Sequence, residues 1–185
     1  MSSSDLIRWG WLAAFGAGVL FIVLTLLAFA VGKGDEASPL DLLAILAYAL
    51  EVVGLVGFHA LQGRNYGRIG RAGLYTAIGG IVVWALVILA SLFGESVSLG
   101  LLAAVGALGM LVGFVLYGAA TLQARVLPRW CGILFIVFIP VGILLAFSLT
   151  SLATALWEGL VWLGLGYALW SQSSGAAAGQ PARVR

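Results

Sequence analysis

The dominant feature of the sequence is a series of six long apolar runs separated by short polar turns. A helix needs about 20 apolar residues to cross a hydrocarbon core about 30 Å thick, and each run has about this length. The strands of a membrane barrel are about 10 residues long and alternate in polarity, so runs of this kind predict helices. The predicted spans are residues 9–31, 40–61, 72–93, 99–122, 130–147 and 152–170.

The composition is typical of a protein that is embedded in lipid. Of the 185 residues, 63% are hydrophobic and 9% are charged, whereas an average soluble domain has about 25% charged residues. We therefore expect an all-α fold with one transmembrane domain, residues 1–170. Residues 171–185 are rich in Ser, Gly, Ala and Gln, a composition typical of disorder, and we expect them to form a disordered cytoplasmic tail.

The distribution of cations predicts the orientation, because Lys and Arg close to membrane spans stay in the cytoplasm. Eight arginines flank one set of span ends: Arg8, Arg64, Arg68, Arg71, Arg125, Arg129, Arg183 and Arg185. The opposite turns contain only Lys33, next to Asp35 and Glu36, and Glu95. We therefore expect a multi-pass protein of the cell membrane whose N- and C-termini are both cytoplasmic.

A short internal repeat occurs at two of the predicted cytoplasmic turns. The pattern Leu-Gln-x-Arg-x-x-x-Arg begins at Leu61 and again at Leu122. Parallel repeats of this kind are known in transporters, where the binding site lies between the repeated units. The repeat predicts three related helical hairpins, with the alternative that all membrane hairpins share cytoplasmic arginines.

The second of these turns carries a resemblance. The segment Arg125-Val-Leu-Pro-Arg129-Trp-Cys-Gly132, with the glycine-spaced span before it, resembles a segment of uncharacterised bacterial multi-pass membrane proteins. The resemblance covers about a quarter of the chain. It implies the same architecture in a bacterial inner membrane, and it implies no particular activity.

Two acidic residues lie well inside the apolar runs, whereas Asp41 is at the start of the second run. Glu51 is at the middle of the second predicted span, and Glu158 is in the outer half of the sixth. A charged side chain at the bilayer centre costs about 3 kcal/mol on insertion scales, and no Lys or Arg is available at that depth. We therefore expect both side chains to face the bundle interior and at least one carboxyl to be protonated at neutral pH.

The surroundings of these acids favour a binding site for a small hydrophobic or cationic solute. Tyr48 is one turn from Glu51, and Trp162 is one turn from Glu158, so aromatic rings could hold a cation. His59 could relay protons between Glu51 and the cytoplasm. The structural alternative is that each protonated carboxyl bonds a neighbouring helix and fixes its position.

The other polar residues give weaker indications of function. Arg64, Arg68 and Arg71 have helical spacing and could bind an anionic lipid headgroup, although their topogenic role alone explains them. The single cysteine and single histidine provide no ligand set for zinc or haem, so we expect no metal and no cofactor. The arginines cluster at turns and form no stripe along a helix, so we expect no nucleic-acid partner.

Three function classes remain. The first is a proton-coupled carrier that uses Glu51 and Glu158. The second is an accessory or substrate-capturing subunit of a membrane complex; the size and helix number resemble the membrane subunits of energy-coupling-factor vitamin importers that bind the substrate. Such a partner, or a second copy, would dock on the small-residue faces of the first and fourth spans. The third, a membrane-embedded enzyme, lacks a recognisable pair of nucleophile and base.

Overall fold

The computed structural model describes residues 3–31, 38, 40–63, 65–93, 99–148 and 151–178. Throughout these ranges the regular structure is helical, with no strand. The helices are α1 (Ser3–Val31), α2 (Leu40–Gln62), α3 (Gly67–Ser91), α4 (Leu99–Ala124), α5 (Arg129–Ser148) and α6 (Ser151–Ala178). The predictions of an all-α fold and of six helices are therefore confirmed.

Five of the six helices, α1 to α5, are long and apolar enough to cross a membrane. The fold is accordingly compatible with a multi-pass integral membrane protein. Over the residues that the structure describes, α6 is not among these helices; its sequence includes Glu158 and several Trp, Gly and Ser residues. A sixth crossing, by α6, stays a prediction from the length and spacing of the apolar runs.

The helix ends differ from the apolar runs at three places. α1 begins at Ser3 and α3 begins at Gly67, several residues before the predicted spans. α6 continues to Ala178, so residues 171–178, which the composition assigns to a disordered tail, are helical. An apolar run marks only the part of a helix that lies in lipid. Extending an existing helix by a few residues costs little free energy, and Ala and Gln favour the helical conformation. Residues 179–185 lie outside the described ranges.

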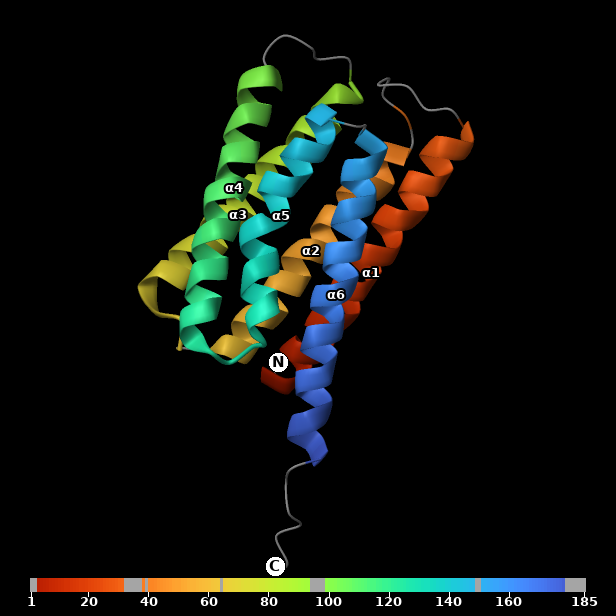
Figure 1. The fold of residues 1–185 in the computed structure, drawn as a ribbon. Coiled ribbons are helices and arrows are strands. Elements are labelled where there is room, and N and C mark those ends of the chain that lie inside the picture. Colours follow the sequence, from red (N-terminus) through yellow and green to blue (C-terminus); the bar gives the residue numbers. More distant parts are fainter. Residues whose placement is uncertain are drawn as a thin grey trace, which may run out of the picture.

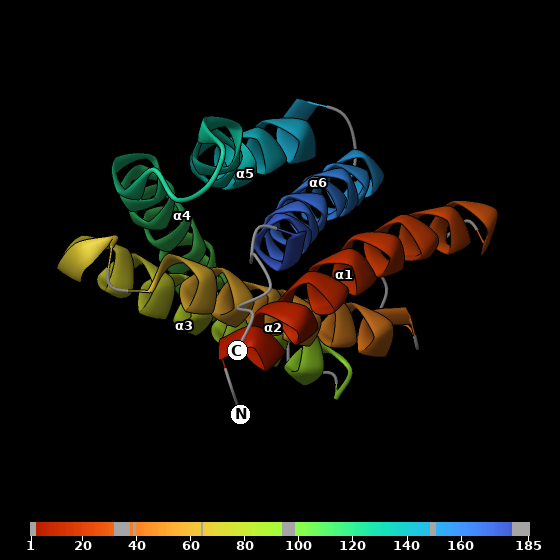
Figure 2. The ribbon, with the colours of Figure 1, turned by 90° about the horizontal axis from the view of Figure 1, so that it is seen from below.

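The helices form a ring in chain order. Each helix packs against the next, and α6 returns to pack along α1, as seen along the bundle in Figure 2. The contacts of α3 with α4 and of α1 with α2 and α6 are extensive, whereas α5 contacts α6 less and α2 only touches α6. The interior of the ring is therefore bounded by α2 to α4 on one side and by α5 and α6 on the other (Figure 2).

The described arginines lie at one end of the bundle. The start of α1 and the end of α6 lie at this end, together with the α2–α3 and α4–α5 turns (Figure 1). The arginines at these positions are Arg8, Arg68, Arg71, Arg125 and Arg129. This clustering agrees with a positively charged cytoplasmic face, and we call it the arginine end. Which face of a membrane it occupies stays a prediction, as does the cytoplasmic position of the two termini.

Glycines allow the closest helix contacts. A Cβ added to Gly80 of α3 would lie 2.4 Å from the backbone nitrogen of Met110 of α4, and one added to Gly113 would lie 2.2 Å from that of Ala77. The same close approach joins α1 to α2, where a Cβ on Gly10 would lie 2.4 Å from Cα of Gly57. Small residues let membrane helices approach until their backbones touch, so these positions determine which faces meet.

The α3–α4 contact can be tested with two adjacent glycines. The substitution Gly80→Ala should destabilise the protein by about 1–3 kcal/mol, because the added methyl group overpacks the contact. Gly79→Ala is the matched control, since Gly79 is exposed and a Cβ there meets nothing within 4 Å. Thermal unfolding in detergent, followed by circular dichroism, measures both. Equal melting temperatures for the two variants would contradict the proposed contact.

Candidate functional site

One face of α2 points into the bundle along its whole length. The residues on this face are spaced by three or four positions, as on one side of a helix, and all are at most 7% exposed: Tyr48, Glu51, Leu55, Phe58 and Gln62. Polar groups occupy both ends of this face, and Leu55 and Phe58 separate them. The face therefore has a polar part near the middle of α2 and another at the arginine end.

A cavity of about 170 Å³ adjoins the first of these polar parts. Its walls come from α2 to α6, and α1 contributes no residue: Tyr48, Trp84, Ala107, Met110, Phe138, Ile139, Gly142, Ile143, Ala146, Thr154 and Glu158. The deepest of these, Met110 and Phe138, lie near the middle of α4 and α5, whereas Ala146 and Thr154 lie close to the α5–α6 connection. The cavity therefore extends from the end opposite the arginines to about the centre of the bundle.

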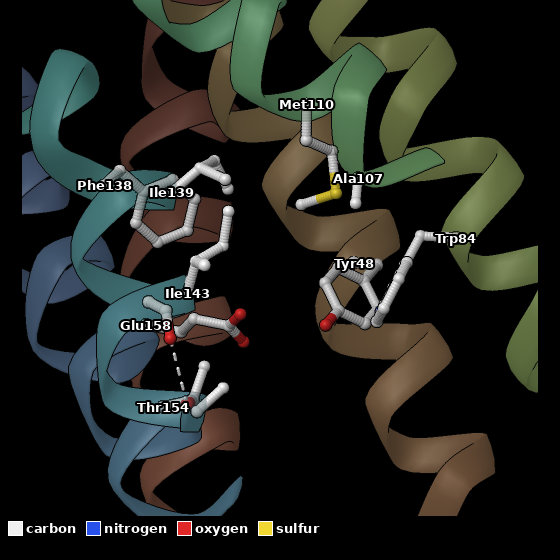
Figure 3. Close-up of a pocket in the computed structure, with 11 residues that line it drawn as sticks. Tyr48, Trp84, Ala107, Met110, Phe138, Ile139, Ile143, Thr154 and Glu158 are labelled. Carbon is white, nitrogen blue, oxygen red and sulfur yellow. Dashed lines mark hydrogen bonds between the residues drawn. The ribbon is translucent and has the colours of Figure 1, made fainter. Parts of the chain in front are cut away.

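Glu158 and Tyr48 face each other across this cavity. In Figure 3 the carboxyl group of Glu158 points from α6 toward the Tyr48 hydroxyl group on α2, and Trp84 lies beside the tyrosine ring. Glu158 is half-buried. The edge of the Phe21 ring on α1 packs against Tyr48 with a centroid distance of 5.3 Å. The structure thus brings together two of the residues predicted to bind a ligand.

The wall formed by α5 and α6 is held by side chains that bond to the backbone. The Thr154 hydroxyl donates to the Gly142 carbonyl at 3.3 Å, and Nε1 of Trp157 donates to the Phe138 carbonyl at 2.9 Å. Pro140 lies between these two acceptors within α5, where it removes one helical hydrogen bond. These bonds position Glu158, which follows Trp157, at the cavity wall.

Glu51 lies at the centre of α2 and is fully buried, but it is not one of the cavity-lining residues. By distance and angle, neither carboxyl oxygen has a hydrogen-bond partner among the described residues, although the Trp162 indole lies close enough to interact with the Glu51 carboxyl. Trp162 packs close by, since a Cβ on Gly54 would lie 2.9 Å from its ring. The Glu51 and Glu158 carboxyls interact electrostatically with each other and with Tyr48. The predicted pair of acids is therefore brought together, with Glu158 at the cavity and Glu51 behind its wall.

Aromatic rings close the cavity toward the arginine end. Phe138 contacts Phe114 edge-to-face at 4.9 Å, and Phe114 and Phe135 stack at 6.0 Å. Phe58 packs its edge on Phe135 at 5.2 Å. These four side chains are at most 1% exposed, and we call them the aromatic layer.

A second polar cluster lies beyond the aromatic layer. The Gln62 amide donates to the Tyr117 hydroxyl at 3.2 Å and to the Thr121 hydroxyl at 3.1 Å. Thr121 in turn bonds the carbonyl oxygen of Tyr117, one turn earlier in α4. All three side chains are at most 2% exposed. The cluster therefore joins α2 to α4 near the arginine end.

His59 takes part in a separate contact at the same end. Burial raises the pKa of Tyr66, and the neighbouring Tyr75 adds to this shift, so the Tyr66 phenol keeps its proton at neutral pH. The Tyr66 hydroxyl and Nδ1 of His59 share a hydrogen bond. Leu55 and Phe58, both fully buried, separate His59 from Glu51 along α2. The geometry thus gives His59 a structural partner, and the predicted proton relay stays a prediction.

The predicted lipid-binding arginines are only partly described. Arg68 and Arg71 are exposed near the start of α3, and Tyr75, one turn after Arg71, is exposed as well. Arg64 lies outside the described residues. A basic, aromatic surface of this kind agrees with a position at a headgroup layer, and binding of a lipid headgroup stays a prediction.

The small-residue faces of α1 and α4 are used within the chain. Ala13, Ala14 and Ala17 of α1 are at most 6% exposed. Gly18 packs on the backbone of α6, and Gly113 of α4 packs on α3. These small residues are therefore in contact with the protein's own helices and are not free to bind a partner. Association with a partner or a second copy stays a prediction.

Several residues of the site were not predicted from the sequence. Thr154 lies four residues before Glu158 on the same helix face, so it could have been predicted. Gln62 was seen only as part of the repeat. Its counterpart Gln123 is exposed whereas Gln62 is buried, so the two turns differ. For Trp84, an aromatic residue inside an apolar run, the sequence contains no signal.

Comparisons with models of protein families, with curated proteins and with solved structures find no match. The class of the protein therefore follows from the fold alone. It is an all-helical chain compatible with a multi-pass integral membrane protein.

The repeat provides a matched test of the buried polar cluster. Gln62→Met should lower stability by roughly 1 kcal/mol, the usual size of a hydrogen-bond contribution between membrane helices, because Tyr117 and Thr121 lose a partner. Gln123→Met changes the exposed counterpart and should leave the melting temperature unchanged. If the two variants unfold at the same temperature, the cluster does not contribute to the α2–α4 contact.

Proposed function

We propose that this protein binds a small solute in the cavity at the centre of the bundle and carries it across the membrane in exchange for protons. Glu158 contacts the solute, and Glu51 and Glu158 share one proton. The observation that carries the proposal is the carboxyl group in the wall of a cavity that reaches the middle of the bundle.

The position of the cavity supports a site on a transport path. Binding sites of transporters typically lie near the bilayer midplane, and the cavity ends about halfway along α4 and α5. The aromatic layer separates it from the arginine end. This arrangement matches a carrier that faces the side opposite the cytoplasm, with the passage to the cytoplasm closed.

The two acids support the exchange of protons. None of the cavity-lining residues is Lys, Arg or His, so no cation compensates two ionised carboxylates there, and keeping both charged is costly. A proton held by the pair removes this cost. A cation that enters the cavity favours the ionised form instead, so its arrival would release the proton.

Access to the cavity can be tested by cysteine labelling in intact cells. Cys131 is the only cysteine and is fully buried, so Cys131→Ala provides the background. In it, Ala146→Cys at the outer end of the cavity and Ala107→Cys in its wall should react with a membrane-impermeant methanethiosulfonate reagent added outside. Both should react because this end of the cavity is accessible to water.

The control is Ala72→Cys, an exposed position near the arginine end of α3. It should react only after the cells are permeabilised. If the Ala107→Cys variant reacts only from the cytoplasmic side, or does not react from either side, the proposed access path is wrong.

The proton-sharing part of the proposal has a spectroscopic test. At neutral pH the infrared spectrum of the purified protein should contain the C=O band of a protonated carboxyl, because exposed Asp and Glu side chains are ionised well below this pH, at about 4. The double substitution Glu51→Gln and Glu158→Gln should remove the band. A wild-type spectrum without the band would refute proton exchange and leave solute binding standing.

A further inference from the structure

The charges around the cavity exclude an anionic ligand. The described arginines lie at the arginine end, beyond the aromatic layer. Among the described residues that line the cavity, the only formal charge is that of Glu158. An anion would meet a carboxyl group in an apolar surrounding with no cation to pair with, which is strongly unfavourable.

The walls favour a cation that carries an apolar body. Trp84, Tyr48 and Phe138 supply aromatic rings, and Met110 and Ile139 supply apolar surface. Aromatic faces attract cations by about 0.5–2 kcal/mol, most strongly for tryptophan. In Figure 3 the Glu158 carboxyl lies on one side of the cavity and the Tyr48–Trp84 pair on the other. A cation between them would interact with both.

The same walls disfavour a bare metal ion. Hard metal cations take six or more oxygen ligands, or at least several carboxylates. Here the side-chain oxygen groups of the lining residues are one carboxyl and two hydroxyls, and one of the hydroxyls, on Thr154, already bonds the Gly142 carbonyl. Among the described residues there is also no cluster of three or more His, Cys, Asp or Glu.

The volume limits the size of the ligand. A cavity of about 150 Å³ in another protein binds benzene, and the cavity here is slightly larger, at about 170 Å³. It can therefore hold one ring or a short branched chain together with one charged group. A fused polycyclic cation is too large without movement of the helices.

We infer that the ligand is a small lipophilic ammonium ion, with an apolar part about the size of one benzene ring and at least one N–H that donates to Glu158. This inference rests on the proposed function, because it assigns the chemical class of the solute to the same cavity.

The test compares ligands of one shape and different charge. Benzylammonium, benzyl alcohol and benzoate are titrated into the full-length protein in lipid nanodiscs by isothermal calorimetry, with empty nanodiscs as the blank. Benzylammonium should bind with one-to-one stoichiometry and about 10- to 100-fold more tightly than benzyl alcohol, the factor expected for a hydrogen bond to a charged group. Benzoate should not bind.

Three variants test whether the preference for benzylammonium over benzyl alcohol depends on the cavity. Glu158→Gln should reduce the affinity for benzylammonium to that for benzyl alcohol. Asp41→Asn, which also removes a negative charge but lies outside the cavity at the start of α2, should keep the wild-type preference. Ala107→Leu fills the cavity and should abolish binding of both ligands, which keeps the test informative if Glu158→Gln fails to fold.

The outcomes separate this inference from the proposed function. Equal affinities for the ammonium ion and the alcohol, or a preference that persists in Glu158→Gln, would overturn the ligand class while the cavity remains a binding site. Absence of benzylammonium binding to the wild type would overturn the ligand class as well. The cysteine labelling, which needs no ligand, decides separately whether the cavity is accessible.

Discussion

The structure depends on one costly feature, a carboxyl group buried at the centre of an apolar bundle. Glu51 is fully buried, and neither of its oxygens has a hydrogen-bond partner among the described residues. Burial of a polar group without a hydrogen-bond partner is unfavourable, and apolar packing around it does not offset this free-energy cost. Buried polar groups of this kind occur chiefly where function requires them. Since Glu158 lies within electrostatic reach and borders a cavity, the cost is explained if a proton or a cation occupies the pair.

Helix packing explains why the cavity lies where it does. Glycine contacts join α3 to α4 and α1 to both α2 and α6 at backbone distance. α5 has such a contact at its arginine end, where Gly132 packs on Gly118 of α4. Toward its other end, a Cβ on Gly142 would meet nothing closer than 3.7 Å. The bundle is thus tight at the arginine end of α5 and looser at the opposite end, and the cavity occupies the looser part.

The sequence predicted the helices and the burial of Glu51, because each depends on a local rule: the length of an apolar run, or the cost of a charge within it. It did not predict that Glu51 lies behind the cavity wall while Glu158 lines it. That difference depends on the rotation of α2 and α6 about their axes, which the contacts of Gly18 and Gly54 with other helices determine. Likewise, burial of Gln62 and exposure of Gln123 follow from packing, although their local sequences are similar.

Transport from the cavity to the arginine end would require the aromatic layer to open. Phe58, Phe114 and Phe135 come from three different helices, so the passage opens only if these helices separate. The α3–α4 contact is too close to slide without clashes, whereas α5 contacts α6 less extensively and contains Pro140. Movement of α5 away from α2 and α4 would part the Phe135 ring from Phe58 and Phe114 and leave the glycine contacts of α3 with α4 and of α1 with α6 intact. Opening along α5, whose contacts with α4 and α6 are less extensive than those of α3 with α4, would therefore connect the cavity with the arginine end.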